Sequence, residues 1–231
     1  MKGSESQESQ EKIRQREKED LEFIKNQPPY FGVEEKPQPD GRIAMFYTGK
    51  MIGERSKVKD RNGYELGYSV KNFVMDSKGS RVGTKEYTQA RFDRFSNQTS
   101  GVREIKDSTG KVLAKEEQQF GKYGLTESSY EELGKKLGSE KIEYSPEGRK
   151  LEENETQFRY NGDKFVGAET RKRVYNENGS LKTSGTIEKD AQGNTVEIFY
   201  DPNGHMVSHL EKDNKGEVVR DVKVALEDQK R

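Results

Sequence analysis

The sequence contains no cysteine and no tryptophan. Without cysteine the chain has no disulfide scaffold, no thiolate metal site and no cysteine nucleophile, and it suits a reducing compartment; we expect a cytoplasmic protein. Long apolar runs are also missing, so no membrane-spanning helix is expected. The N-terminal stretch MKGSESQESQEKIRQREKED has no apolar segment of the kind that a signal peptide requires.

Hydrophobic residues make up only 28% of the chain, whereas charged residues make up 36%. The 42 basic residues balance the 42 acidic ones, which argues against binding nucleic acid or anionic membranes through bulk charge. Because the two signs are interleaved, we expect them to pair across a surface rather than to cause disorder. Eleven Tyr and ten Phe supply flat amphipathic side chains that a thin fold can use.

The first 40 residues differ in composition from the rest. Residues 8–26 are rich in Glu, Gln, Lys and Arg, which favour a helix. The apolar set of Ile13, Leu21, Phe23 and Ile24 is sparse, so we expect a helix that frays at its start. Three alternatives remain for this helix: docking on a partner, docking on its own sheet, or standing as a solvated tail. Residues 27–41 are rich in proline and predict an extended linker.

A four-residue turn signature recurs after residue 41, beginning with Asp, Asn or Ser and ending with Gly. A type I turn favours a short polar side chain at its first position, where it accepts hydrogen bonds from the backbone ahead. The residue after such a turn is left-handed, a conformation that Gly adopts freely. The signature occurs at Asp60–Gly63, Asp76–Gly79, Asp107–Gly110, Ser145–Gly148, Asn176–Gly179, Asp190–Gly193, Asp201–Gly204 and Asp213–Gly216.

The turns recur at intervals of roughly a dozen residues, which fits one strand and one turn per unit. In the longer interval between Gly79 and Gly110 we expect a further turn at Asn97–Gly101. The Asn161-Gly162 pair predicts another two-residue hairpin. Repetition on this scale predicts a stacked or meandering array.

Between the turns, apolar and polar residues alternate as they do in strands, for example in Tyr64–Val74 and Asn194–Tyr200. Residues 126–137 are ambiguous, because Ser128 and Glu131 have the spacing of a helix capping box, but Gly134 and the repeat pattern favour strand. The prediction is an all-β fold, an antiparallel β-meander of hairpin repeats in a single-layer or curled sheet, preceded by a helix. The apolar content is too low for a two-sheet sandwich.

Three regions follow from this pattern: a helix and proline-rich linker over 1–40, a β-hairpin repeat domain over 41–226 and a tail over 227–231. The repeat units resemble known families. Asp190–Val219 resembles a YD (RHS-like) repeat, and the units at 47–83 and 160–185 resemble MORN-variant repeats. The resemblance covers about half of the chain. It implies a long antiparallel sheet used for contact, commonly with proteins, in antitoxin-like and interaction proteins, and it implies no catalytic residues.

The histidines do not predict a metal site. His205 and His209 follow a turn, so we place them on a strand, where residues four apart are about 13 Å apart, too far to share one zinc ion. The acidic turns contain fragments of a calcium loop without its closing Glu. Basic clusters at 171–173 and 135–136 have acidic neighbours, which favours a charge-balanced sheet face. We expect no metal and no cofactor.

The function hypothesis is a non-enzymatic protein-interaction module or scaffold that contacts a protein partner or a second copy through a sheet face or edge. The candidate contact residues are Tyr64, Tyr68, Phe199 and Tyr200, although aromatic ladders within a sheet are the better explanation for each of them. The alternative is a sheet that binds a ligand or nucleic acid through a Tyr-rich face, with nucleic acid disfavoured by the neutral charge.

Overall fold

The computed structural model describes residues 4–28, 30 and 32–224. One helix, α1, spans Ser4–Lys25 and precedes the strands. The strands are β1 (Glu34–Pro37), β2 (Ile43–Tyr47), β3 (Lys50–Lys59), β4 (Glu65–Met75), β5 (Arg81–Arg91), β6 (Thr99–Asp107), β7 (Val112–Gly121), β8 (Gly124–Glu132), β9 (Lys135–Tyr144), β10 (Lys150–Asn161), β11 (Lys164–Tyr175), β12 (Leu181–Asp190), β13 (Thr195–Tyr200), β14 (Met206–Lys212) and β15 (Val218–Lys223). The predicted tail at 227–231 lies outside the described residues.

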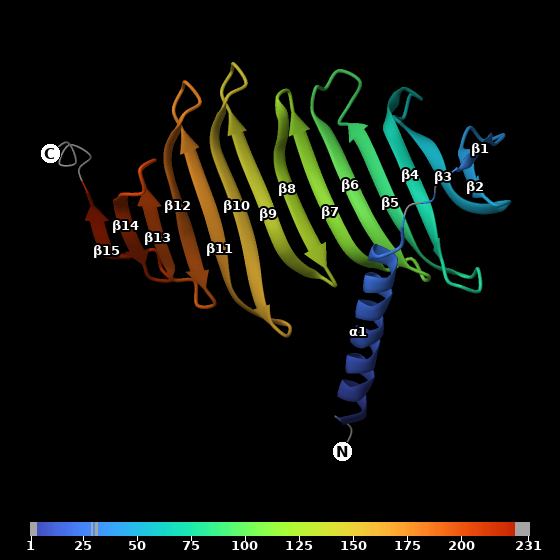
Figure 1. Ribbon diagram of the computed structural model, residues 1–231, viewed down its shortest axis with the longest axis horizontal. Helices are drawn as coiled ribbons and strands as arrows, with labels where there is room; N and C mark the ends of the chain where they lie inside the picture. Colours follow the sequence, from blue (N-terminus) through green and yellow to red (C-terminus); the bar gives the residue numbers. More distant parts are fainter. Residues whose placement is uncertain (1–3, 29, 31, 225–231) are drawn as a thin grey trace. The chain divides into compact units, whose positions relative to one another are not determined.

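The strands form one antiparallel sheet in which the spatial order is the chain order, β1 to β15 (Figure 1). Each strand therefore pairs only with the strands before and after it in the sequence. This confirms the predicted all-β meander of hairpins with an N-terminal helix. Among the described residues, no helix combines the length and the apolar character that crossing a membrane requires.

The predicted turn signatures form as expected. In the turn at Asp201, for example, the carboxylate accepts hydrogen bonds from the backbone N–H groups of Asn203 and His205, each at 2.9 Å. The N–H of Gly204 donates to the carbonyl of Asp201 at 3.0 Å. The glycines that end the eight signatures have φ angles between 80° and 97°, in the region that L residues with a Cβ rarely adopt.

Three local predictions need correction or refinement. The turn between β5 and β6 lies at residues 92–98, before the predicted Asn97–Gly101, because Asp93 accepts the N–H of Phe95 at 2.7 Å and Ser96 accepts that of Gln98 at 3.0 Å. Gly101 is part of β6. The hairpin predicted at Asn161-Gly162 forms, but its two loop residues lie one position later, because residue 161 still belongs to β10.

The ambiguous stretch 126–137 is strand, as the repeat pattern favoured. It contains the end of β8 and the start of β9. Leu133 and Gly134 form the two-residue loop between them with φ angles of 49° and 77°, the positive values that the tight type I′ hairpin loop requires.

The predicted linker over 27–41 contains a strand. β1 pairs with β2 through Glu34 to Pro37, so the sheet begins before the expected boundary at residue 41. Proline fits here because β1 is the first strand of the sheet and a strand at the edge has one row of unpaired backbone groups.

The sheet is divided between two compact units. The first unit contains the residues up to Gly121 together with Tyr130–Gly134, and the second contains Lys122–Ser129 and the residues from Lys135 onward. The division falls within the predicted repeat domain, and each unit is described by itself below.

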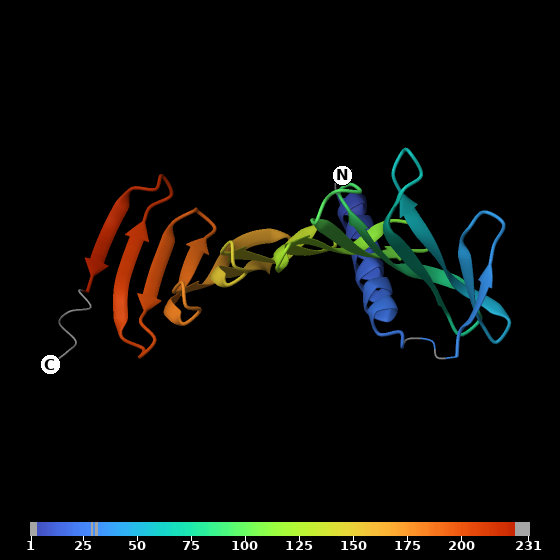
Figure 2. The ribbon, with the colours of Figure 1, turned by 90° about the horizontal axis from the view of Figure 1, so that it is seen from above.

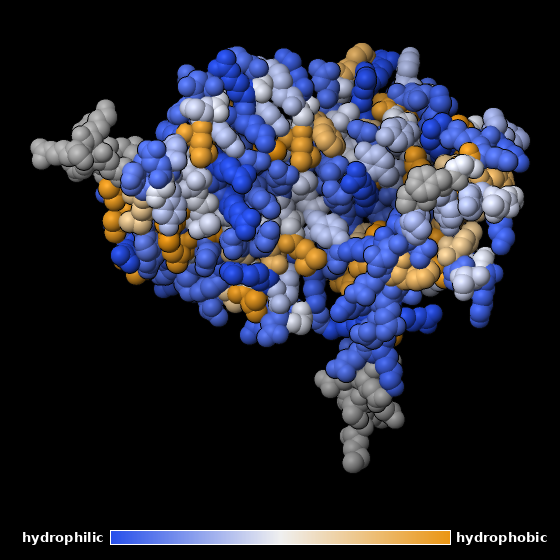
Figure 3. All heavy atoms as spheres, viewed as in Figure 1, coloured by the Kyte–Doolittle hydropathy of each residue, from blue (hydrophilic) through white to orange (hydrophobic). Residues whose placement is uncertain are grey.

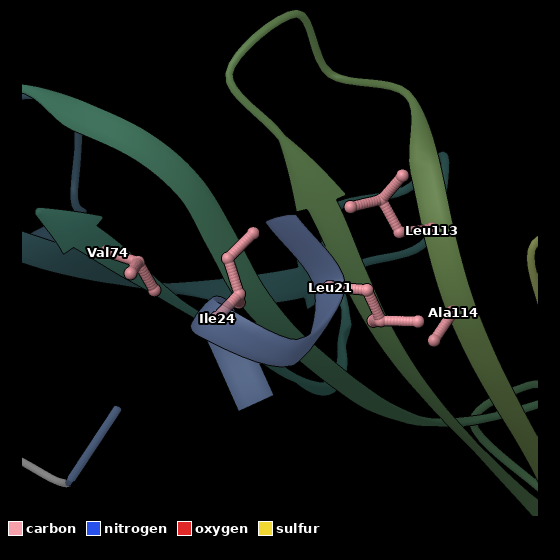
Figure 4. Close-up of a cluster of buried hydrophobic side chains, with 5 residues drawn as sticks. All are labelled: Leu21, Ile24, Val74, Leu113 and Ala114. Atoms are coloured by element: carbon pink, nitrogen blue, oxygen red, sulfur yellow. The ribbon is translucent and has the colours of Figure 1, made fainter. Parts of the chain in front are cut away.

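In the first unit, α1 packs on one face of β5, β6 and β7 (Figures 1 and 2). Its Leu21 and Ile24 are buried against Val74, Leu113 and Ala114 (Figure 4). The two helix residues are three positions apart, so they lie on the same side of the helix. The outward surface of α1 is hydrophilic (Figure 3). The helix is therefore docked through a narrow apolar stripe, and it begins at Ser4, before the predicted start at residue 8.

Polar contacts also hold the second half of α1 on the sheet. Lys111, in the turn before β7, forms an ion pair with Glu17. At the end of the helix, Lys25 forms an ion pair with Glu132 of β8. The alternative of a solvated tail is thus wrong for the second half of the helix, where both ion pairs and both buried side chains lie.

Candidate functional site

The predicted contact residues of the first unit lie on or next to β4. Tyr64 precedes the strand and is 51% exposed, with the guanidinium of Arg94 lying 4.7 Å from the centre of its ring. Tyr68 is 40% exposed and its hydroxyl donates to Gln89 on β5 at 3.2 Å. Both tyrosines therefore keep a free surface, but only Tyr68 belongs to a hollow.

The predicted contact residues of the second unit do not share a face. Phe199 and Tyr200 are consecutive on β13, and successive residues of a strand point to opposite faces. Phe199 lies opposite Gly185 of β12, where its ring atom Cδ1 occupies the space that a side chain at residue 185 would fill. Tyr200 is 39% exposed. Phe199 is thus an aromatic residue packed within the sheet, and Tyr200 alone offers a contact surface.

A hollow of about 530 Å³ lies on the helix-bearing face of the first unit, beside the end of α1. We call it the helix-side hollow. Its lining comes from the end of α1 and from β4 to β8 and includes Tyr68, Val70, Lys85, Tyr87, Arg103 and Tyr130. Most of its surface is apolar. This combination of a concave apolar surface and a few polar groups is typical of ligand sites.

Cross-strand register explains how the hollow is assembled. Directly opposite residues of neighbouring strands point to the same face. One row runs from Val70 of β4 through Tyr87 of β5 and Arg103 of β6 to Glu116 of β7. The row nearer to the helix runs through Asn72, Lys85, Ile105 and Ala114. Thus residues that are far apart in the sequence become neighbours on one surface.

Two tyrosines form one wall of the hollow. The rings of Tyr68 and Tyr87 are 6.0 Å apart between centroids and inclined at 65°, an edge-to-face arrangement favoured by aromatic quadrupoles. The guanidinium of Arg103 lies 5.2 Å from the ring of Tyr87 and forms an ion pair with Glu116 at 3.1 Å. Burial raises the pKa of the Tyr87 hydroxyl, so Tyr87 stays neutral at physiological pH.

At the helix end, Lys25, Tyr130 and Glu132 form a polar network. The hydroxyl of Tyr130 and the ammonium of Lys25 both donate to the carboxylate of Glu132. Burial disfavours the charge on Lys25, but the contacts with Glu132 and Tyr130 outweigh it and raise the pKa of Lys25. Likewise, burial opposes the charge of Glu132, but its contact with Lys25 lowers the pKa of the carboxyl group. Both groups of this pair are therefore charged near neutral pH.

Lys85 has a different environment. Its ammonium donates to the backbone carbonyls of Lys25 and Gln27, each at 3.1 Å. These carbonyls belong to the C-terminal end of α1, where backbone acceptors lack helical partners and the helix dipole favours a cation. Burial lowers the pKa of Lys85, because no opposing charge compensates for its lost hydration. Lys85 therefore caps the helix while lining the hollow.

The basic clusters are neutralised within the sheet, as predicted. On β11, Lys172 pairs with Glu152 at 2.8 Å and Arg173 pairs with Glu153 at 3.2 Å. At the start of β9, Lys135 pairs with Asp163 at 2.7 Å. Lys136 has a different contact, since its ammonium lies 5.4 Å from the centre of the Phe158 ring.

His209 lies on β14 as predicted, whereas His205 belongs to the turn before that strand, because its backbone closes the turn on Asp201. His205 Nδ1 is 3.2 Å from the carboxylate of Asp201. His209 Nε2 is 2.8 Å from Glu211, although the geometry is not that of a hydrogen bond and the nitrogen is buried. Within the described ranges, no group of three or more His, Asp or Glu residues is arranged to hold a metal ion.

Tyr87, Lys85, Arg103 and Tyr130 are functional candidates that the sequence did not single out. Each stands in a strand of ordinary alternation, and nothing local distinguishes it. The information that was missing is the register: Tyr87 lies opposite Val70 only because the pairing of β4 with β5 shifts between Val74 and Met75. The helix-side hollow is suited to binding a ligand, since it offers an apolar surface, aromatic hydroxyls and cations.

Comparisons with known proteins add little. No protein-family model matches the sequence, and no curated protein matches it. Among solved structures, the chain is similar to one in "Crystal Structure of TcdB2-TccC3-Cdc42", with 8% sequence identity and a TM-score of 0.11. That similarity covers 78% of this chain and 16% of the other. At this TM-score it carries no argument about function.

Proposed function

We propose that this chain is a non-enzymatic interaction module or scaffold that presents its hairpin sheet to another protein or to a second copy of itself. This is the function implied by the resemblance to MORN-variant and YD repeats, of which an antitoxin-like role is one form. The proposal assigns no catalytic step and no cofactor.

The observation that carries the proposal is the open sheet of the second unit. Its described residues form strands of the single sheet, so within the unit neither sheet face is covered by a helix or by another sheet. Among its described residues, the buried hydrophobic ones are Ile142 and Ala168. The side chains on both faces are therefore available for contact, and Val166, Val196 and Tyr200 add exposed apolar area.

The test uses the full chain as bait in an extract of its native cells, together with two double variants. One replaces Tyr68 and Tyr87 with Ala in the first unit, and the other replaces Val196 and Tyr200 with Ala in the second. We expect the wild-type chain either to capture a defined protein from the extract or to form a dimer in sedimentation equilibrium. We expect one of the two double variants to lose that capture or that dimer. A monomeric chain that retains nothing above a scrambled-sequence control contradicts the proposal.

A second candidate function rests on the Tyr68–Tyr87 pair and Arg103. Tyrosines beside an arginine are the elements with which sheets stack single-stranded bases or aromatic ligands. Titration of labelled polynucleotides at low and high salt separates this candidate from the first, because nucleic-acid binding weakens steeply as salt rises. No polynucleotide binding at low salt removes the nucleic-acid form of the candidate.

A further inference from the structure

We propose that the helix-side hollow binds a small amphipathic anion, a molecule with a flat apolar body and a single carboxylate or sulfonate group. This goes beyond the protein contact proposed above and does not depend on it. The inference rests on the size of the hollow, the apolar residues of its floor and one lysine on the same face that has no carboxylate partner.

The hollow suits the apolar body of such a molecule. Its volume of about 530 Å³ lies within the range of roughly 300–1,000 Å³ that is usual for small-molecule sites. Val70, Ile105 and Ala114 form the apolar part of its floor. Tyr68 and Tyr87 form a wall whose exposed ring surface is able to stack against a planar group.

Lys85 suits the anionic group. A lysine ammonium has three N–H donors, and two of those of Lys85 go to the carbonyls of Lys25 and Gln27. Across residues 4–28, 30 and 32–224, the structure gives Lys85 no carboxylate partner. The third N–H donor is left for solvent or for a bound anion.

The other charges of the lining already have partners. Arg103 is paired with Glu116 and Lys25 with Glu132. The carboxylates of Glu86 and Glu104, which also contribute to the lining, are both bound by Lys106, at 2.9 and 2.7 Å. Lys115 is paired with Glu117. Because Lys106 serves two carboxylates, the charges around the hollow balance as a whole. Glu86, Glu104 and Lys115 form a cross-strand row that alternates with the row of Lys85, so their side chains point to the other face of the sheet. On the helix-bearing face, Lys85 is the cation of the described lining without a carboxylate partner, and it complements a ligand with one negative charge.

The test compares two fluorescent probes with a similar aromatic body. One is 8-anilinonaphthalene-1-sulfonate, which carries a single negative charge, and the other is N-phenyl-1-naphthylamine, which is neutral. The measured quantity is the ratio of their dissociation constants for the purified full chain. A ratio cancels any change in the apolar surface that a substitution causes, because such a change affects both probes.

The central variant is Lys85→Met, which keeps an unbranched side chain, shorter by the terminal ammonium group, and removes its charge. We expect the affinity for the sulfonate probe, relative to the neutral probe, to fall about tenfold, which corresponds to about 1.4 kcal/mol. Lys85→Arg keeps the charge and should restore the ratio to within about threefold of wild type. Tyr87→Ala should weaken both probes together and leave the ratio unchanged.

The matched control is Lys182→Met, which removes an exposed lysine from β12 of the second unit. It should change neither affinity. The proposal is overturned if Lys85→Met leaves the ratio unchanged, if Lys182→Met lowers it equally, or if the wild-type chain binds the sulfonate probe no more tightly than the Tyr87→Ala variant does.

Discussion

In the first unit a helix covers part of the sheet, whereas the second unit consists of strands alone within its described residues. The first unit buries Leu21, Ile24, Val74, Leu113 and Ala114 in one cluster. The second buries far less apolar surface. Because strands without a covered face specify their register weakly, the second unit depends on its turns and on cross-strand pairs. The same hairpin repeat is thus stabilised by two different sets of interactions.

The largest effect that separates the two units is expected for Ile24→Ala. Ile24 is fully buried, at 0% exposure, and removal of such a side chain costs about 2–5 kcal/mol. Amide hydrogen exchange should show faster opening of α1 and of β5 to β7, with little change in β11 to β13. The control Ile13→Ala, on the same helix but 54% exposed, should change neither. Equal loss of protection in both units would show that they unfold as one.

A smaller effect is expected for Gly185→Ala in the second unit. A Cβ at residue 185 would meet the carbonyl oxygen of Ile198 and the ring of Phe199, and overpacking of this kind costs about 1–3 kcal/mol. The control is Gly138→Ala in the same unit, where the nearest atom to a new Cβ is the carbonyl oxygen of Thr156, 3.6 Å away. Urea denaturation should detect the loss for Gly185→Ala only. A loss of equal size in Gly138→Ala would mean that any side chain weakens these strands.

Acid is expected to weaken the turns of both units. At Asp107, burial opposes ionisation, but hydrogen bonds from Thr109 and from backbone N–H groups outweigh it and lower the pKa below the ordinary value of 3.8. At Asp190 a hydrogen bond from Asn194 is the main cause of a similarly lowered pKa. Both carboxylates therefore bind protons more weakly in the folded state, and their contribution is present above the unfolded pKa.

This contribution should be lost in the acid interval that runs from the ordinary pKa of 3.8 down through the lowered, folded-state pKa. The Asn variants of Asp107 and Asp190 keep an acceptor oxygen but do not titrate. We expect the melting temperature of each variant to depend less on pH over this interval than that of the wild type. A variant whose melting curve shifts with pH as strongly as the wild type excludes that turn as a source of acid sensitivity.

The smallest effect is expected for Glu132→Gln in the first unit. The substitution removes the ion pair with Lys25. The side chain of Lys25 is 36% exposed and that of Glu132 is 23% exposed. Pairs near the surface contribute about 0–1 kcal/mol and are screened by salt. Urea denaturation at low and high salt should therefore show a small loss that shrinks as salt rises. A loss as large as that of Ile24→Ala would place the anchoring of α1 in this ion pair rather than in its apolar stripe.

Local features of the fold could be predicted from the sequence because each turn is encoded by its own four residues. Asp201 binds the N–H groups of Asn203 and His205 whatever the rest of the chain does. The turn after β5 was placed too late because Asp93 and Ser96, rather than a terminal Gly, organise it. The strand in the linker was missed because proline was given more weight than the pairing of β1 with β2.

The candidate site could be predicted only in part. Tyr68 was identified from its alternation, but its partners Tyr87 and Arg103 depend on the register of three strands. That register includes shifts, such as the one between Val74 and Met75, which no local pattern reveals. Phe199 was included because it is aromatic, yet its position over Gly185 is set by the neighbouring strand.

The identity of chain order and strand order has a mechanical consequence. Each strand is bonded only to its neighbours in the sequence, so a force that pulls the C-terminal end away removes β15 first, then β14, without disturbing pairs further along. Under such a force the sheet would come apart one strand at a time. Removal of β7 should need a larger force than removal of the strands after it, because α1 contacts β5, β6 and β7 together.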